Sequence, residues 1–419
     1  MSYHTLFFLL FCSTLGYSNP PDLSQLKLEF VQAIWRHGER AALSDLYPVF
    51  EANWTFGGGG FGELTPRGMA QMDEFGALIR KRYVAEQLFL TQRFKANQIH
   101  IRSTDVNRTI LSAQSLLYGL YPPGDWNVAG LDYPATDFWQ PGFTFISVHV
   151  DGKDKCATSQ TCDCPRISEL LTTMQKLPEV QEAMKKIFAL NRQVAGYYNI
   201  SKDADQFMTY ADAWKCQRAY FNDSMYRQLP FYTEQLYTTA QTTYAPYKGF
   251  IQGYFKLRAL RAGPLLNELY QRALEKFECS QSPGTCGGYL RAMKFYGYSM
   301  HDNNVYSTLV VLGLQNLTGT LDGWPDYASG IVFEFFRNST SNERFFKVLH
   351  RAKTGQDLQE VTEMIANCDG STFCPFSAFQ KLADMYRPVP DYQKACLATT
   401  SSSKINVFAV FLCIFVLVQ

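Results

Sequence analysis

Apolar and polar positions divide the first part of the chain into a short buried strand and a long amphipathic helix. The run FVQAIW at Phe30–Trp35 is apolar except for one glutamine, and the polar stretch RHGER follows at once, which is typical of a strand that ends at a loop. In Glu63–Phe89, apolar side chains recur at helical spacing, with Thr65 suited to the helix cap and Pro66 to its first position. Because α/β proteins place their chemistry at strand ends, the loop after Trp35 is the first candidate site.

Further strands and helices follow along the chain. Asn97–Pro123 predicts a strand at residues 99–102 and then a helix from about Thr104 that stops before two prolines. An aromatic run predicts a strand that ends at His301. Two β-rich runs, GIVFEFFRN and ERFFKVLHRA, are separated by STSN and predict a hairpin. Strands that alternate with helices indicate an α/β fold with a mixed central sheet flanked by helices.

The middle of the chain differs from its two ends. From Cys164 to about Ala292 the pattern is mostly helical with polar faces, as in RISELLTTMQKLPEVQEAMKKIFALNRQVA. We interpret this stretch as a helix-rich insertion that covers one side of the sheet. The predicted organisation is a signal peptide at 1–18, an α/β catalytic domain at 19–150 and 291–392, a mainly helical insertion or cap at 151–290, and a polar spacer with a hydrophobic membrane-anchor segment at 393–419.

Composition narrows the class of protein. With 419 residues, 46% apolar and 15% aromatic, the chain can bury a large core and is neither disordered nor fibrous. The formal net charge of +1 gives no global field that would draw the protein onto nucleic acid, so we expect no nucleic-acid partner. Any anion site must therefore come from a local cluster of basic residues.

Both ends of the chain carry targeting signals. Thr5–Ser18 is a short apolar core that closes on small residues, which predicts a secretory signal cleaved near Ser18. Ser401–Gln419 is a polar spacer and an apolar tail, whose unbroken part, Val407–Val418, has 12 residues against the roughly 20 that a spanning helix needs. This length favours a lipid-anchor signal or a short membrane anchor, with a buried terminal strand as the alternative. We therefore expect a membrane-attached protein of the secretory pathway, lysosomal or extracellular.

Cysteine usage agrees with that route. Nine cysteines lie between Cys156 and Cys396, and an oxidising compartment would pair most of them and leave one over. Cys156, Cys162 and Cys164 have no second cysteine or histidine pair nearby, so disulfides are favoured over a metal site. Cys368 and Cys374 are close enough to bridge locally. Five glycosylation sequons support the same compartment: Asn53, Asn199, Asn222, Asn316 and Asn338.

The cluster RHGER has the composition of a phosphate site. Arg36 and Arg40 flank His37, and guanidinium groups present a planar fork of donors that matches phosphate oxygens. Fixed cations also stabilise the charge that spreads over a phosphoryl group during transfer. Because two positive charges keep a nearby histidine neutral, His37 would retain a free ring nitrogen as a nucleophile.

Three motifs together resemble the histidine acid phosphatase family, in the branch of secreted prostatic and lysosomal acid phosphatases. They are RHGER at 36–40, IRSTDVNRT at 101–109 and YSMHDNN at 298–304, and the helix GELTPRGMAQMDEFGALIRKRY is similar as well. The resemblance covers most of the chain, from about residue 28 to residue 390. It implies a phosphoglycerate mutase-like fold and hydrolysis of small phosphate monoesters at acidic pH.

The resemblance also implies a role for each site residue. His37 corresponds to the nucleophile that forms a phosphohistidine, and Asp302 to the acid that protonates the leaving alcohol. No metal and no cofactor is implied, because side chains supply the positive charge. Relatives of the prostatic type imply a homodimer, and the family's link between the middle and the end of the chain would suit a Cys156–Cys396 disulfide. The residues that would bind the phosphate are Arg36, Arg40, Arg102 and His301.

Two other functions remain as alternatives to a broad acid phosphatase. One is a narrower phosphatase of the same chemistry that acts on inositol phosphates or lysophospholipids, although the helical insertion is not obviously basic. The other is an inactive extracellular phosphate-binding module, and the presence of both His37 and Asp302 speaks against it. The chain departs from the family pattern after Arg40, where AAL replaces the common Arg-x-Pro. We therefore expect its substrate pocket to differ more than its catalytic residues.

Overall fold

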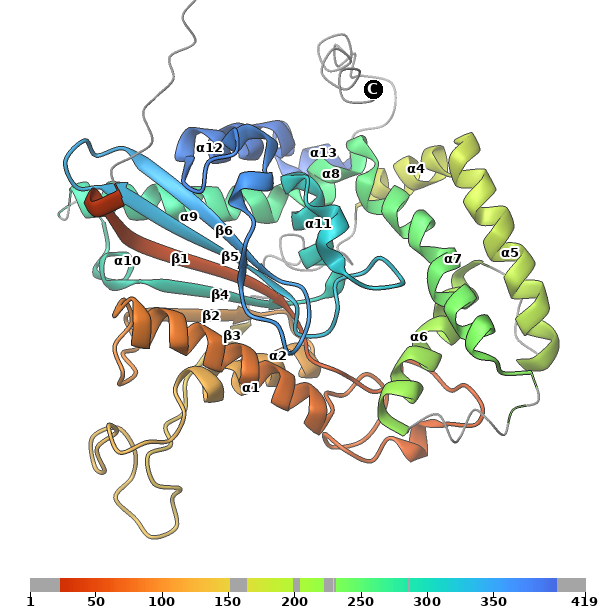
Figure 1. Ribbon diagram of the computed structural model, residues 1–419, viewed down its shortest axis with the longest axis horizontal. Helices are drawn as coiled ribbons and strands as arrows, with labels where there is room; N and C mark the ends of the chain where they lie inside the picture. Colours follow the sequence, from red (N-terminus) through yellow and green to blue (C-terminus); the bar gives the residue numbers. More distant parts are fainter. Residues whose placement is uncertain are drawn as a thin grey trace, which may run out of the picture.

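A mixed sheet of eight strands forms the centre of the molecule (Figure 1). The computed structural model describes residues 23–150, 164–198, 204–221, 229, 231–282, 284 and 286–397. Along the sheet the strands run in the order β3-β2-β4-β1-β5-β6-β7, and β8 pairs with β6. The strands are β1 Leu26–Arg36, β2 Ile99–Ser103, β3 Val148–Val150, β4 Phe295–Met300, β5 Gly330–Asn338, β6 Arg344–Arg351, β7 Gln359–Glu360 and β8 Cys374–Pro375.

The register of the central strands brings distant segments to one edge of the sheet. β1 runs parallel to β4, with Arg36 opposite Met300, and β2 runs parallel to β4 on its other side, with Ser103 opposite Ser299. The residues that follow these three strands therefore start at the same edge. This explains how the three separate motifs come together.

Helices cover both faces of the sheet (Figure 1). Along β1, Val31 and Trp35 pack into a core with α1 and α2, while Phe30 and Ile34 pack into a second core with α9 and α12. This alternation is the two-residue period of a strand that is buried on both faces. The covering helices are α1 Pro66–Arg80, α2 Asn107–Leu120, α9 Gly263–Gln281 and α12 Phe376–Tyr386.

A group of helices from the middle of the chain lies beside the sheet (Figure 1). Their apolar faces form a hydrophobic core of their own, and Ala41, Ala42 and Trp54 from the loops after β1 are buried in it. Ala41 and Ala42, which follow Arg40, are thus part of the packing between this helical group and the loop after β1. The helices of the group are α4 Pro165–Met174, α5 Pro178–Tyr198, α6 Ala204–Phe221 and α7 Glu234–Gly253.

Shorter helices complete the chain. The π-helix η3 Lys81–Glu86 continues α1 directly, so the helix predicted over Glu63–Phe89 is present. The remaining helices are α8 Phe255–Arg261, α10 Gly288–Ala292, α11 Asp302–Leu312 and α13 Tyr392–Leu397. One-turn 3-10 helices occur at η1 Leu23–Gln25, η2 Glu51–Asn53, η5 Gln315–Thr318, η6 Thr362–Met364 and η7 Ala366–Cys368.

The predicted elements at the two later motifs are confirmed with small shifts. The hairpin is formed by β5 and β6, which pair antiparallel. The helix predicted from about Thr104 begins at Asn107, because the backbone N–H of Thr104 still donates to Ser299 O across the sheet edge, at 3.2 Å. The chain then turns before the helix starts.

Three disulfides occur among the described residues, which is consistent with an oxidising secretory compartment. The bridge between Cys368 and Cys374 is confirmed. The expected Cys156–Cys396 disulfide was wrong, because Cys396 pairs with Cys164. Their Cα atoms lie 4.7 Å apart, since α13 packs against the start of α4. The third bridge joins Cys279 to Cys286. Cys156 and Cys162 lie outside the described residues.

The targeting signals expected at the two ends fall on segments 1–22 and 398–419, outside the described residues. Within residues 23–397, as far as they are described, we find no helix with the length and apolar character needed to cross a bilayer. Membrane attachment therefore stays a prediction.

Candidate active site

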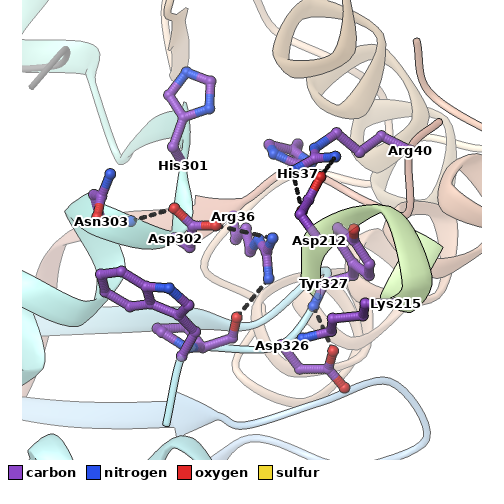
Figure 2. Close-up of polar contacts among 12 residues, drawn as sticks. Arg36, His37, Arg40, Asp212, Lys215, His301, Asp302, Asn303, Asp326 and Tyr327 are labelled. Carbon is purple, nitrogen blue, oxygen red and sulfur yellow. Dashed lines mark hydrogen bonds and ion pairs between the residues drawn. The ribbon is translucent and has the colours of Figure 1, made fainter. Parts of the chain in front are cut away.

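A cavity of about 500 Å³ opens at the carboxyl ends of β1 and β4. One wall comes from the loops that follow these strands, and the other from α6, α7 and the segment before β5. Figure 2 shows side chains from both walls pointing toward one another. Five of the six predicted site residues line the cavity: Arg36, His37, Arg40, His301 and Asp302.

The backbone around His37 is fixed by neighbouring segments. Its N–H donates to Met300 O at 3.0 Å and its carbonyl accepts from the N–H of Ala328 at 3.2 Å. The next residue is a glycine because a Cβ at Gly38 would come within 2.2 Å of the carbonyl oxygen of Gly68 on α1. The turn in RHGER can therefore pass close to this helix only without a side chain at its centre.

The ring of His37 is buried, neutral and held in one tautomer. Nδ1 lies 2.8 Å from the carbonyl oxygen of Gly38, which can only accept, so Nδ1 carries the proton and Nε2 keeps its lone pair. Burial, followed by the positive charges of Arg36 and Arg108, lowers the pKa of His37 well below its usual value. His37 therefore offers an unprotonated nitrogen even in mild acid.

Three arginines of the cavity keep buried donors without an acceptor. Among the described residues, no group accepts a hydrogen bond from Nε of Arg36, Arg40 or Arg108, although all three side chains line the cavity. A buried donor without a partner is costly to maintain. An anion in the cavity would satisfy these donors, as guanidinium groups do with phosphate.

Arg36 and Arg40 are each positioned by further contacts. Arg36 donates to Pro325 O at 2.7 Å and pairs with Asp302 at 2.9 Å. Arg40 forms two hydrogen bonds with the carboxylate of Asp212 on α6, at 2.9 and 3.1 Å. Figure 2 shows the contact of Arg36 with Asp302 and the contact of Arg40 with Asp212. The helical group therefore orients one of the arginines of the site.

Arg102 is the one predicted site residue that the structure places outside the cavity. Arg102 does not line the cavity; it pairs with Glu268 of α9 at 2.7 Å and lies 5.1 Å from the centre of the Tyr298 ring. Arg108, at the start of α2, lines the cavity instead. Both arginines belong to the motif IRSTDVNRT, in which the family resemblance pointed to Arg102, whereas the cavity is lined by Arg108.

His301 and Asp302 lie at the amino end of α11. His301 is the N-cap residue, its ring centre lies 5.6 Å from that of His37, and burial with the charge of Arg108 lowers its pKa to about 4. Its Nε2 is 3.0 Å from Oγ1 of Thr104. The Asp302 carboxylate accepts from the N–H of Asn303 at 2.8 Å. The Arg36 guanidinium holds the pKa of Asp302 below its usual value despite burial, so Asp302 is ionised without a ligand.

Sequence reasoning missed the residues that the helical group contributes. They carry no motif, since α6 and α7 show only an ordinary helical pattern in the sequence. Nowhere in the described part of the chain do three or more His, Cys, Asp or Glu side chains form a group that could hold a metal ion. The charged residues added to the cavity by the helical group and the segment before β5 are Asp212, Lys215, Lys248 and Asp322.

Comparisons with known proteins agree with this geometry. The family model described as "Histidine phosphatase superfamily (branch 2)" matches residues 27–351. "Putative acid phosphatase 10" of Caenorhabditis elegans is 49% identical over 94% of this chain and 100% of its own length. Prostatic acid phosphatase of Rattus norvegicus is 29% identical over 95% of each chain. In fold, the phytase of Hafnia alvei is similar, with a TM-score of 0.61 and 15% identity over 90% of this chain and 99% of that one.

Proposed function

The chain belongs to branch 2 of the histidine phosphatase superfamily, and from this membership we propose that it is an acid phosphatase. It hydrolyses phosphate monoesters to an alcohol and orthophosphate. One observation carries the proposal: three arginines with buried, unpartnered Nε donors line the same cavity as a neutral histidine. A phosphate group fits this arrangement in both charge and hydrogen bonding.

In the first step, Nε2 of His37 attacks phosphorus and the bond to the ester oxygen breaks. Arg36, Arg40 and Arg108 stabilise the charge on the phosphoryl oxygens in the transition state. The hydrogen bond from Nδ1 to Gly38 O supports the positive charge that develops on the ring of the phosphohistidine. His301 is close enough to His37 to contact the same phosphoryl group.

Asp302 supplies the proton that the leaving oxygen needs. A bound phosphate competes for Arg36 and adds negative charge beside the carboxylate, and both effects raise the pKa of Asp302 from its low value in the free enzyme. The protonated acid then donates to the alcohol. In the second step the carboxylate accepts a proton from the water that attacks phosphorus, which releases orthophosphate and restores His37.

The dependence of kcat on pH tests this assignment of protonation states. Because burial and the neighbouring arginines lower the pKa of His37 well below its usual value, the nucleophile is protonated only at more acidic pH than an ordinary histidine. The rate should fall at higher pH as Asp302 in the complex loses its proton, by up to about tenfold per pH unit. We expect a maximum near pH 5, measured with 4-nitrophenyl phosphate. A maximum above pH 8 would contradict the proposal.

The two arginines of the motif IRSTDVNRT provide a matched pair of variants. We expect Arg108→Ala to lower kcat/KM by about 10²–10³-fold, the usual loss for one donor to the transition state. Arg102→Ala should lower kcat/KM by less than about tenfold, but it should reduce thermal stability because Glu268 loses an ion-pair partner. Activity assays and thermal unfolding of both proteins separate the two roles. A larger kinetic loss in Arg102→Ala would reverse the assignment.

We also propose a cellular setting. The protein would pass through the secretory pathway and remain attached to a membrane through residues 401–419, in a lysosomal or extracellular location. The disulfides support the pathway, and the length of the apolar tail supports the attachment. A homodimer remains a prediction from the family resemblance.

A further inference from the structure

A second group of charges lies in the cavity, away from the strand ends. Lys215 comes from α6, Lys248 from α7 and Asp322 from the segment before β5. Lys248 and Asp322 are buried. The mechanism outlined above uses none of the three, and no motif in the sequence indicated them.

One carboxylate holds both lysines. Oδ2 of Asp322 lies 3.2 Å from Nζ of Lys215 and 3.6 Å from Nζ of Lys248. The Lys248 ammonium also lies 5.1 Å from the ring centres of Tyr244 and of Trp324. The other oxygen of Asp322 accepts from the backbone N–H of Trp324 at 3.3 Å. The lysines are therefore directed to Asp322 and to aromatic faces.

The charges that line the cavity nearly balance. Five cationic side chains and three aspartates face it, and both histidines are neutral, so the surplus is two positive charges. Two of the aspartates already pair with arginines of the anion site, Asp302 with Arg36 and Asp212 with Arg40. Asp322 cancels one of the two lysine charges and its Oδ2 contacts both ammonium groups, so a second phosphate would have to compete with this carboxylate for Lys215 and Lys248.

We propose that Asp322 is a specificity-determining residue that restricts the site to monoesters whose alcohol carries no second phosphate. The inference rests on the proposed phosphatase function and adds a substrate class to it. Asp322 acts by occupying Lys215 and Lys248, the two cations that would otherwise receive another anionic group. The uncharged part of the lining suits a neutral leaving group: it includes the apolar and aromatic side chains of Leu43, Val106, Tyr244 and Trp324 and the amides of Gln241, Asn303 and Asn304.

Two substrates that differ by one phosphate test the proposal: phenyl phosphate and 1,4-phenylene bisphosphate. The quantity to measure is kcat/KM for the bisphosphate, counted per phosphate group, divided by kcat/KM for phenyl phosphate. At pH 5 Lys248 is charged, since burial lowers its pKa only to about 8. We expect a ratio below about 0.1 for the unmodified enzyme and at least a tenfold increase in Asp322→Asn, because one nearby charge is removed.

Two further variants make the result specific. Adding Lys248→Gln to Asp322→Asn should lower the raised ratio again. Asp132→Asn also removes an ion-paired carboxylate, the partner of Arg93, but outside the cavity, and it should leave the ratio unchanged.

The outcomes distinguish a failure of the role proposed for Asp322 from a failure of the proposed phosphatase function. If the unmodified enzyme hydrolyses both substrates equally well, or if Asp322→Asn is active with an unchanged ratio, the role of Asp322 is refuted while the phosphatase function stands. If the unmodified enzyme hydrolyses neither substrate, both proposals fail. The ratio for the unmodified enzyme decides the matter even if Asp322→Asn does not fold.

Discussion

His37→Ala is expected to lower kcat for phosphate monoester hydrolysis by at least about a thousandfold, the largest loss of any single substitution in this site. The methyl group of alanine cannot form the bond to phosphorus. The other histidine of the cavity, His301, has its Nε2 3.0 Å from Oγ1 of Thr104. Hydrolysis of 4-nitrophenyl phosphate at about pH 5 gives the rate, and an alkaline quench followed by mass spectrometry should find phosphate on His37 in the unmodified enzyme only.

A second buried histidine provides the control for this experiment. His350 on β6 is buried and also has its pKa lowered, to about 4, by burial, yet it does not line the cavity. We expect His350→Ala to lower stability and to retain kcat. Equal rates for His37→Ala and the unmodified enzyme would rule out the mechanism, whatever the effect on stability.

Asp302→Asn is expected to have the second largest effect, and its size should depend on the leaving group. The alkoxide of glycerol phosphate departs poorly without a proton, so kcat should fall by about 10²–10⁴-fold for this substrate. The 4-nitrophenolate ion is a much better leaving group, and its loss should be clearly smaller. Parallel measurements of kcat for both substrates test this difference.

Asp302 also pairs with Arg36, so its role as an acid must be separated from its effect on that arginine. Asp326 is a suitable control, because its charge raises the pKa of Arg36 without its side chain lining the cavity. Asp326→Asn should reduce kcat by the same factor for both substrates. If Asp302→Asn also gives equal factors, Asp302 positions Arg36 and is not the proton donor.

The sequence predicted the parts of the site that depend on local patterns. Arg36, His37 and Asp302 stand directly at the ends of apolar strands, and the parallel pairing of β1 with β4 brings such ends together in any fold of this class. The choice between Arg102 and Arg108 depended on tertiary structure. Arg102 is the fourth residue of β2 and meets Glu268, which is 166 positions away in the chain.

The contribution of α6 and α7 could not be predicted for a similar reason. A lysine on an amphipathic helix is usually part of a solvated face. Whether Lys215 and Lys248 face solvent or a cavity depends on how the helices pack against the segment that contains Asp322. The disulfide partner of Cys396 could not be predicted either, because spacing along the chain does not determine which cysteines pair.

The bridge between Cys164 and Cys396 also has a mechanical meaning if the tail is tethered to a membrane. Cys396 lies one residue before the end of α13, the last described helix. A pull on the tail would therefore pass through the covalent bridge to the start of α4 and the small apolar cluster around Leu257. The backbone that leads back from α13 to α12 would share this load with the bridge, so the disulfide would reduce the pull on the strands that precede His37 and Asp302.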